Sequence, residues 1–327
     1  MVHVVVTGGA GFLGARLARE LLRAGTLGVA GGVPRPVRRL TLIDRAGVPA
    51  DLAADDRVTA ARGDLAGQLM PGMIEGADVV FHLAAAVSAE CEADFDLGIH
   101  ANLRGTEALL AACRALGTSP VVVFASSVAV FGGSPSRPLP PVIDDRTAPN
   151  PQTSYGTQKV ISEHLLADYT RKGFLRGRAV RLMTVAVRPG RPNRAASGFV
   201  SGIIREPLAG QRAACPVPAD TQVALASPAK AVTALLRAAT SAEQAWGDRS
   251  AVTMPALTVS VGEMAAALDR VAGPGVSALI DWTPDPVITA MMAGWPARVK
   301  ADRAARLGLT PDPDFDSIIQ LHLAESG

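Results

Sequence analysis

The chain has 327 residues, of which 48% are hydrophobic and 19% charged, and its 32 basic residues nearly balance its 30 acidic ones. This length allows one large α/β domain with an appendage, or two modest domains that share a cleft. The balanced charge argues against a general nucleic-acid-binding surface, and the apolar segment around residues 79–87, which contains His82, is too short to span a bilayer.

The sequence predicts a cytoplasmic protein without a metal site. It begins within an apolar segment and shows no basic leader, so we expect no secretory signal. Cys91, Cys113 and Cys215 are odd in number and lack CxxC spacing, which fits a reducing compartment better than a disulfide framework. The five histidines lack the spacing of metal ligands. We therefore expect a small-molecule substrate, with no membrane or nucleic acid as partner.

Short β-branched segments alternate with helical patterns along the first half of the chain. Helices are predicted over residues 13–23 and 103–115. Strands are predicted over residues 2–7, 40–44, 58–63, 78–83 and 120–126. Because these strands are continuously apolar, we expect both of their faces to be buried. The pattern predicts a Rossmann doubly wound parallel sheet, which is an α/β fold.

Two segments rich in turn-forming residues interrupt this pattern. Residues 24–39 contain many Gly, Pro and Arg residues and predict a surface loop, whereas residues 132–152 predict a loop that leads into a helix over 155–172. Farther along, the sequence predicts a strand over 178–187 and helices over 227–242 and 261–272.

The predicted elements suggest a division into two domains. Residues 1–190 form the predicted Rossmann domain, and residues 227–254 are expected to pack back on it. Residues 191–226 and 255–327 form a smaller, discontinuous C-terminal substrate lobe in this interpretation.

A glycine-rich motif, TGGAGFLG at residues 7–14, lies between the first predicted strand and a helix. It reads GxGxxG from Gly9 and GxxGxxG from Gly8. Its glycines permit a tight turn and a close approach of main-chain N–H groups to a pyrophosphate, and the N-terminus of the helix favours the negative charge. The motif therefore predicts a dinucleotide cofactor.

Asp44 ends the second predicted strand and bears on the choice of that cofactor. Its carboxylate can accept hydrogen bonds from both adenosine ribose hydroxyls and would repel a 2′-phosphate, so NAD is expected. It lies farther from Gly14 than is usual, which we attribute to the insert at residues 24–39. Arg45, the next residue, keeps NADP open as an alternative.

Tyr155 and Lys159 predict proton transfer. Residues four apart share one face of a helix, so the Lys159 ammonium can lie near the Tyr155 phenol. A nearby positive charge favours the phenolate and lowers the pKa of a tyrosine, which makes it a usable general base.

A pair of hydroxyls, Ser126 and Ser127, ends the strand that precedes the 132–152 loop. The carboxyl edge of a parallel sheet faces the ligand crevice, so one of these hydroxyls can bind the reacting oxygen. The alternative is that the pair only caps the end of the strand.

The motifs TGGAGFLG, HLAA (residues 82–85), NLRGT (102–106), SSVAVFG (126–132) and YGTQK (155–159) occur in this order. As an ordered set they resemble the extended short-chain dehydrogenases/reductases, the NAD-dependent epimerase/dehydratase family, over about the first 190 residues. The resemblance implies a catalytic Ser127, rather than Ser126, and a Tyr155 base whose modulator, Lys159, also holds the nicotinamide ribose. Asn102 matches a helix position that contacts the cofactor or its water relay. Phe131 departs from the tyrosine common in sugar-nucleotide enzymes.

The same resemblance assigns further residues to NAD. Gly8, Gly11, Phe12 and Leu13 match the pyrophosphate loop, Asp64 and Leu65 match the adenine contact, and Leu83, Ala84 and Ala85 match the wall near the nicotinamide half. The family also implies a homodimer, formed by packing of the helices that carry Asn102 and Tyr155.

The stretches SYGTQK (residues 154–159), RPGRPN (188–193), SGIIREPL (201–208) and CPVP (215–218) resemble the branch of this family that oxidises the C2 hydroxyl of a four-carbon sugar acid such as D-erythronate to the 2-oxo acid. A sugar acid needs a cation for its carboxylate, and an arginine can bind a carboxylate through two hydrogen bonds. The candidates are Arg188, Arg191, Arg194 and Arg205. Arg188 is the leading one, and most of the others are expected to be solvated surface residues.

Three alternatives remain open from the sequence. A sugar-nucleotide epimerase or dehydratase uses the same Tyr155 and Lys159 but keeps its NAD bound. A non-catalytic NAD(H)-sensing protein usually lacks this pair. Nucleic-acid binding through residues 171–194 lacks interleaved aromatic residues and a strong net charge.

Overall fold

The computed structural model describes residues 1–67, 70–190 and 197–326. The chain forms two compact units, and the ranges of both are discontinuous. Unit 1 consists of Met1–Ser127, Thr153–Arg181 and Val232–Val252; unit 2 consists of Val128–Gln152, Leu182–Ala231 and Thr253–Gly327. The predicted first domain differs from unit 1, since residues 128–152 and 182–190 belong to unit 2.

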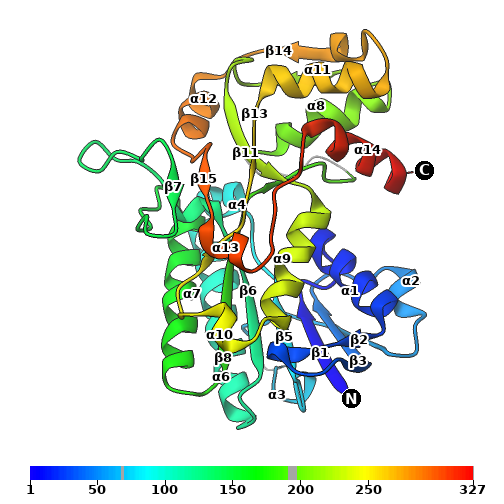
Figure 1. Cartoon of the computed structure of the whole chain (residues 1–327), viewed down its shortest axis with the longest axis vertical. Helices are drawn as coiled ribbons and strands as arrows, with labels where there is room; N and C mark the ends of the chain where they lie inside the picture. Colours follow the sequence, from blue (N-terminus) through cyan, green and yellow to red (C-terminus); the bar gives the residue numbers. More distant parts are fainter. Residues whose placement is uncertain (68–69, 191–196, 327) are drawn as a thin grey trace. The chain divides into compact units, whose positions relative to one another are not determined.

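Unit 1 is built around one large sheet (Figure 1). Its strands run in the order β12-β8-β6-β5-β1-β3-β2, and β4 also pairs with β3. The pairs β1–β3, β1–β5, β5–β6 and β3–β4 are parallel, which confirms the predicted Rossmann-like α/β fold. The strands are β1 Val2–Thr7, β2 Thr26–Leu27, β3 Arg35–Asp44, β4 Val58–Arg62, β5 Val79–His82, β6 Val121–Ser127, β8 Arg176–Leu182 and β12 Val252–Thr253.

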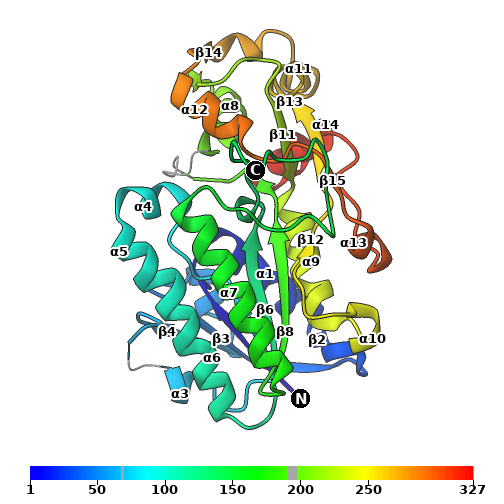
Figure 2. The ribbon, with the colours of Figure 1, turned by 90° about the vertical axis from the view of Figure 1, so that its left-hand side faces the viewer.

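Helices cover both faces of this sheet, with α6 and α7 on one face and α1 on the other (Figures 1 and 2). Every residue of β1 is buried, as the continuous apolar pattern predicts. The helices are α1 Phe12–Ala24, α2 Ala50–Ala53, α3 Met70–Met73, α4 Ser88–Ala93, α5 Phe95–Gly98, a π-helical turn Ile99–Arg104, α6 Gly105–Ala115, α7 Ser154–Arg171, α9 Pro228–Thr240 and α10 Glu243–Trp246.

The segment 24–39 is not the surface loop that its composition predicts. Strand β2 pairs antiparallel with the start of β3, and Thr26 lies opposite Pro36. A proline cannot donate to a ladder of hydrogen bonds, but it is tolerated near the start of a strand, where Pro36 lies in β3. The insert therefore extends the sheet at its edge.

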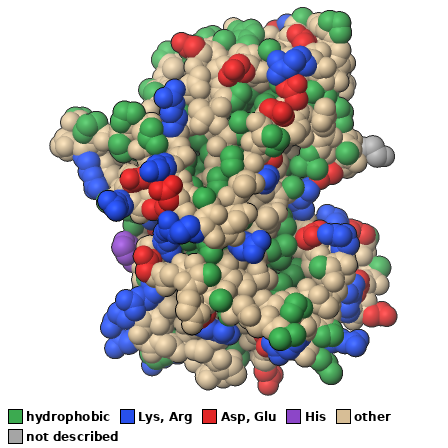
Figure 3. All heavy atoms as spheres, viewed as in Figure 1, with side chains coloured by type: hydrophobic (Ala, Val, Ile, Leu, Met, Phe, Trp, Pro, Cys, Tyr) green, Lys and Arg blue, Asp and Glu red, His purple; other side chains and the backbone are tan. Residues whose placement is uncertain are grey.

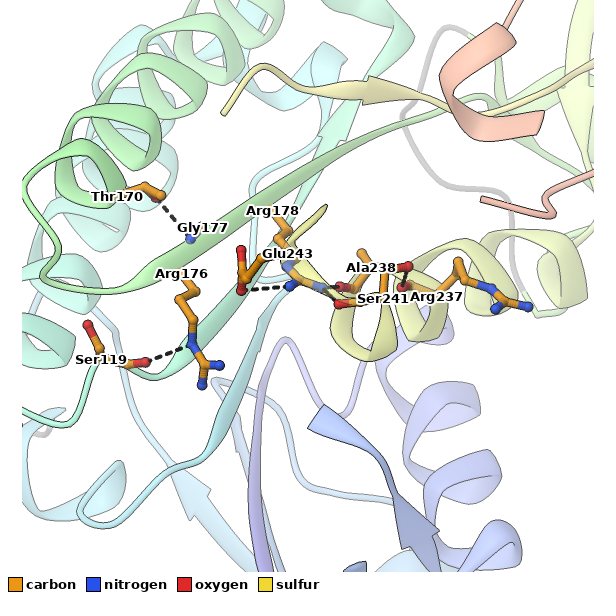
Figure 4. A network of polar contacts seen from close by, with 9 residues as sticks. All are labelled: Ser119, Thr170, Arg176, Gly177, Arg178, Arg237, Ala238, Ser241 and Glu243. Atoms are coloured by element: carbon orange, nitrogen blue, oxygen red, sulfur yellow. Dashed lines mark hydrogen bonds and ion pairs between the residues drawn. The ribbon is translucent and has the colours of Figure 1, made fainter. Parts of the chain in front are cut away.

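A buried arginine joins β8 to the segment Val232–Val252 within unit 1 (Figure 4). Arg178 donates from Nη1 to the carbonyl oxygens of Ala238 and Ser241, at 2.5 and 2.6 Å, and from Nη2 to Glu243 at 2.9 Å. The arginine thus satisfies carbonyl groups at the C-terminal end of α9, which a helix leaves without internal partners.

Unit 2 contains three small sheets and five helices within the part of it that is described. The predicted strand 178–187 is split, because β8 belongs to the large sheet whereas β9 pairs with β11 in unit 2. Its strands are β7 Ile143–Asp144, β9 Thr184–Val185, β10 Ala213–Cys215, β11 Gln222–Ala226, β13 Leu257–Ser260, β14 Ile280–Trp282 and β15 Val299–Lys300. Its helices are α8 Gly198–Leu208, α11 Val261–Ala272, α12 Pro286–Ala293, α13 Asp302–Arg306 and α14 Phe315–Ser326.

Local capping explains why α11 has the bounds that the sequence predicts. The Ser260 hydroxyl accepts from the Glu263 N–H at 3.1 Å, and the Glu263 carboxylate accepts from the Ser260 N–H at 3.0 Å. This reciprocal arrangement begins a helix because it satisfies two main-chain donors at once. Apolar residues of α8, α11 and α14 share the core of unit 2, among them Ile203, Leu268 and Ile319.

The charges on the surface and the character of the helices bear on the partners that the chain could bind. Acidic and basic side chains are interspersed on the face drawn in Figure 3, in agreement with the balanced composition. Among the described residues, none of the helices combines the length and apolar character that crossing a membrane requires.

Candidate active site

The loop after β1 has the shape that its glycines permit. Gly8 adopts a φ of +72°, and a Cβ there would lie 2.7 Å from the main-chain nitrogen of Ala84. A Cβ on Gly14 would collide with the carbonyl oxygen of Gly8. Both positions therefore require glycine: one for its left-handed backbone, and the other because α1 approaches the loop closely.

Helix α1 begins directly after this loop, and Phe12 and Leu13 are its first residues. The residue before it, Gly11, is extended and has no side chain to cap the helix, and the first turn contains no acidic residue. The N–H groups and the positive end of the helix dipole are therefore suited to an anion such as a pyrophosphate.

A cavity of about 250 Å³ lies beside the glycine loop, within unit 1. Eight of the residues predicted to contact the cofactor line it: Gly8, Gly11, Asp44, Asp64, Leu65, Leu83, Ala84 and Ala85. Arg45, which the sequence raised as a group that could favour NADP, also lines it. The motifs did not single out three further lining residues: Ile43, Gly63 and Ala101. Each of them directly precedes Asp44, Asp64 or Asn102, so adjacency to a predicted site residue was the available signal.

Two carboxylates in this cavity already hold main-chain N–H groups. Asp44, at the end of β3, accepts from Ala10 at 3.0 Å and from Ala46 at 2.9 Å. Asp64 accepts from Ala66 at 3.0 Å and contacts Nε2 of His100 at 2.7 Å. An ionised carboxylate has about four acceptor sites, so each group retains capacity for a ligand hydroxyl or amine. Asp44 also ties the glycine loop to the neighbouring strand.

Tyr155 and Lys159 lie together on α7. The Thr153 hydroxyl caps this helix by accepting from the Gly156 N–H at 3.1 Å, which places Tyr155 in the first turn. The Lys159 Nζ lies 5.4 Å from the centre of the Tyr155 ring and donates to the carbonyl oxygen of Ala125 at 2.8 Å. Burial lowers the pKa of Lys159 to about 8, although the nearby Cys91 and Glu163 oppose this shift. Tyr155 and Lys159 therefore lie together, as predicted. The Lys159 ammonium loses its proton near pH 8.

The two serines at the end of β6 have different surroundings. Ser126 is buried, and its hydroxyl donates to Glu163 Oε1 at 2.5 Å. Ser127 is only half-buried. Successive side chains of a strand point in different directions, so the two hydroxyls are expected to have different partners.

Asn102 lies in the π-helical turn and is buried. Its Oδ1 accepts from the Ala86 N–H at 2.7 Å, while its Nδ2 donates to the Ala86 carbonyl oxygen at 3.2 Å and to Gln158 Oε1 at 2.7 Å. The Asn102 side chain thus connects α7 with the segment that follows the cavity wall.

His82 belongs to a buried chain of hydrogen bonds that the motifs do not reveal. The Thr106 hydroxyl donates to the Asn102 carbonyl oxygen at 2.6 Å, so it accepts from His82 Nε2 at 2.9 Å. His82 Nδ1 must then accept from the Thr7 hydroxyl at 2.7 Å. Burial and the charge of Lys159 lower the pKa of His82 to about 3, so the ring is neutral. Its partners are distant in sequence, and no local spacing indicates them.

The arginine candidates fall into two groups. Arg191 and Arg194 lie outside the described residues. Arg188, in unit 2, donates its N–H to the Ser201 hydroxyl at 3.0 Å. Arg205 donates from Nη1 to the Arg188 carbonyl oxygen at 2.7 Å and from Nη2 to Glu206 at 2.5 Å. Arg205 is therefore engaged in holding the main chain at Arg188 rather than exposed as the sequence suggests.

The motifs also missed an ion pair formed by Glu163, which lies one helical turn after Lys159. Arg181 Nη2 lies 2.7 Å from Glu163 Oε2, and both side chains are buried. The available signal was the position of Glu163, four residues after Lys159 and hence on the same helix face.

A doubly wound parallel sheet, a glycine loop after its first strand and a Tyr–Lys pair on α7 define a Rossmann-type nucleotide-binding protein equipped for proton transfer. Residues 4–245 match the model of the NAD dependent epimerase/dehydratase family, and the chain belongs to this family. The predicted family and the predicted NAD cofactor are thereby confirmed.

Two relatives match over essentially their whole length. The D-erythronate dehydrogenase of Cupriavidus necator is 48% identical over 100% of this chain and 99% of its own. The D-erythronate dehydrogenase of Haemophilus influenzae is 39% identical over 98% of both chains.

Solved structures also resemble this chain. A crystal structure described as a nucleoside-diphosphate-sugar epimerase from Agrobacterium tumefaciens is 43% identical, with a TM-score of 0.91 over 99% of this chain and 94% of that one. The L-threonine 3-dehydrogenase of Trypanosoma brucei, 20% identical with a TM-score of 0.84 over 99% of this chain and 97% of that one, supports the fold alone.

Proposed function

We propose that the chain oxidises the C2 hydroxyl of a four-carbon sugar acid, such as D-erythronate, to the 2-oxo acid with NAD as the oxidant. The observation that carries this proposal is the buried Lys159 ammonium, 5.4 Å from the centre of the Tyr155 ring. The names of the two full-length relatives supply the substrate class.

The NAD site in this proposal is the cavity beside the glycine loop. Gly8, Gly11, Phe12 and Leu13 would hold the pyrophosphate, Asp44 the adenosine ribose, and Asp64 and Leu65 the adenine. Leu83, Ala84 and Ala85 would form the wall near the nicotinamide half, and Tyr155 and Lys159 would hold the nicotinamide ribose. The steric need for glycine at residues 8 and 14 supports this assignment, since it lets α1 begin close beside the loop and offer the N–H groups of its first turn to a phosphate.

When bound, NAD supplies the acceptor for the C2 hydride. The Tyr155 phenolate takes the proton of the C2 hydroxyl, and the Ser127 hydroxyl donates a hydrogen bond to the same oxygen. The Lys159 ammonium favours the ionised form of Tyr155. Asn102 completes this catalytic set by holding Ala86, directly after the cavity wall.

Arg188 is the proposed ligand of the substrate carboxylate. An arginine can bind a carboxylate through two parallel hydrogen bonds. The contacts of Ser201 and Arg205 with its main chain support this choice, because they fix the base of the side chain. In this proposal residues 1–190, together with 227–254, bind NAD, and residues 191–226 and 255–327 bind the sugar acid.

The proposal is tested by incubating the protein with NAD and aldonic acids of four to six carbons and following NADH absorbance. We expect NADH to accumulate with a four-carbon acid and in proportion to the acid consumed. A Lys159→Met variant should lose this activity. Absence of NADH formation with every acid, in protein that binds NAD, would overturn the proposal.

A second candidate is a sugar-nucleotide epimerase, which the description of the 43% identical solved structure favours. Such an enzyme regenerates its NAD in each cycle and releases no NADH. Conversion of a UDP-sugar without net NADH formation would support it over the dehydrogenase.

We also propose a cytoplasmic homodimer that acts in carbohydrate metabolism. The three cysteines are buried and unpaired in disulfides, which suits a reducing compartment. Sedimentation velocity of the purified chain should give the mass of a dimer.

A further inference from the structure

Three consecutive residues at the end of β6 bind three different groups. The carbonyl oxygen of Ala125 accepts from Lys159 Nζ, and the Ser126 hydroxyl donates to the Glu163 carboxylate. Ser127 is the hydroxyl assigned to the substrate above. The end of β6 therefore contacts two charged side chains of α7, Lys159 and Glu163, which follow Tyr155 along the helix.

Glu163 is held by more than this one hydroxyl. Arg181, on β8, donates from Nε to Oε1 at 2.9 Å and from Nη2 to Oε2 at 2.7 Å. Strand β8 neighbours β6 in the sheet, so this bidentate pair and the Ser126 hydroxyl fix the Glu163 carboxylate from two adjacent strands. All three side chains are buried, where an ionised carboxylate is stable only if it is paired.

The other groups that face Lys159 are uncharged near neutral pH. Cys91, on α4, can raise the pKa of Lys159 only as a thiolate, and burial raises the pKa of the Cys91 thiol above its usual value. His82, on β5, is neutral because its pKa is about 3. Tyr155 carries the phenol whose ionised form Lys159 favours in the proposed function. Glu163 is therefore the anion that offsets the cost of keeping a buried ammonium at this position, and Arg181 binds both oxygens of its carboxylate.

We propose that Glu163 is a positioning residue that keeps Lys159 protonated beside Tyr155. In this proposal Arg181 and Ser126 determine how strongly the negative charge of the Glu163 carboxylate acts on Lys159. This inference rests on the role that the proposed function gives to Lys159. It assigns a task to three buried residues that do not contact the reacting atoms.

Two substitutions that break the same ion pair should have opposite effects. Glu163→Gln removes the anion and leaves the Arg181 cation, so Lys159 should lose its proton about one pH unit lower. Arg181→Gln leaves Glu163 uncompensated, and Lys159 should keep its proton about one pH unit higher. The Ser126 hydroxyl still donates to the Glu163 carboxylate in that variant.

The titration can be observed without turnover by carbon NMR of protein with ¹³C-labelled lysine. The chain has four lysines, and a Lys159→Arg variant assigns the signal of the buried one. The high-pH limb of kcat/KM should move in the same direction as that signal. A purely structural ion pair would instead weaken activity in both variants without opposite shifts.

Arg178→Gln is the matched control, since Arg178 is also buried on β8 but pairs with Glu243. It should leave the Lys159 titration unchanged. Ser126→Ala is a milder variant that keeps both charges and should raise the Lys159 midpoint by about half a unit or less, even if Arg181→Gln does not fold.

Shifts in one direction for Glu163→Gln and Arg181→Gln, or shifts no larger than in Arg178→Gln, would overturn the inference. If Arg181→Gln does not fold, an unchanged midpoint in both Glu163→Gln and Ser126→Ala would overturn it as well. Full activity of Lys159→Met would instead overturn the proposed role of Lys159 itself, so the two failures can be told apart.

Discussion

The glycine loop and the end of β6 belong to the same unit, but different interactions hold them in place. The loop owes its shape to main-chain sterics, since side chains at residues 8 and 14 would meet backbone atoms. The end of β6 is fixed by side chains from α7 and β8, through Lys159, Glu163 and Arg181. Changes to the loop should therefore alter cofactor binding, whereas changes near β6 should alter proton transfer and turnover.

The largest expected effect is that of Tyr155→Phe, which removes the proposed base and keeps the ring. We expect kcat to fall by about 10² to 10⁴, the usual contribution of a general base, while NADH affinity stays nearly unchanged. Steady-state kinetics with a four-carbon acid and titration of NADH fluorescence measure the two quantities. Near-normal turnover would rule out Tyr155 as the base.

The serines offer a comparison within one strand. Ser127→Ala should lower kcat by about 10², since it removes a hydrogen bond to the reacting oxygen. Ser126→Ala should lower kcat at neutral pH by only about twofold and cost about 1–3 kcal/mol of unfolding free energy, because the buried Glu163 loses a donor. Parallel kinetics and urea unfolding test this, and a reversed ranking in kcat would place the substrate hydroxyl contact at Ser126.

Gly14→Ala tests the loop side of the comparison. The added methyl collides with the Gly8 carbonyl, and relieving such overpacking costs about 1–3 kcal/mol, or roughly a tenfold to hundredfold loss in NAD affinity. Gly47→Ala is the control, because a Cβ there meets nothing within 4 Å. Calorimetric titration with NAD should separate the two variants, and equal affinities would contradict the steric account.

A smaller effect than that of Gly14→Ala is expected for Asp44→Asn, which keeps an acceptor for the Ala10 N–H but removes the charge that repels a 2′-phosphate. The preference for NAD over NADP should fall by about tenfold, in line with the loss of one charge-assisted hydrogen bond. Initial rates with both cofactors measure it. An unchanged preference would assign the selection to another group, such as Arg45.

The sequence predicted the parts of the site that short segments encode. The glycine loop and the Tyr155–Lys159 pair each depend on spacing within one strand-to-helix turn or one helix, so periodicity and motif spacing indicate them. The contacts of His82 with Thr7 and Thr106, and of Glu163 with Arg181, join distant segments, and only packing brings them together.

For the fold, too, the sequence predicted the elements that a short segment encodes, and it missed those that depend on pairing with distant segments. The central strands β1, β5 and β6 are largely apolar, which identifies them without knowledge of their neighbours, whereas β4 and β8 also contain charged residues. The edge strand β2 is two residues long and lies in a segment rich in glycine and proline, so only its pairing with β3 identifies it. The split of residues 178–187 between β8 and β9 likewise depends on which strands they meet.

The most direct test of the account follows the C2 hydrogen itself. The protein is incubated with NAD and a four-carbon sugar acid deuterated at C2, and the released cofactor and acid are analysed by mass spectrometry. The account predicts that the deuterium appears in released NADH and that the acid leaves as the 2-oxo product. Recovery of the deuterium in an inverted sugar acid, with no net reduction of the cofactor, would contradict it.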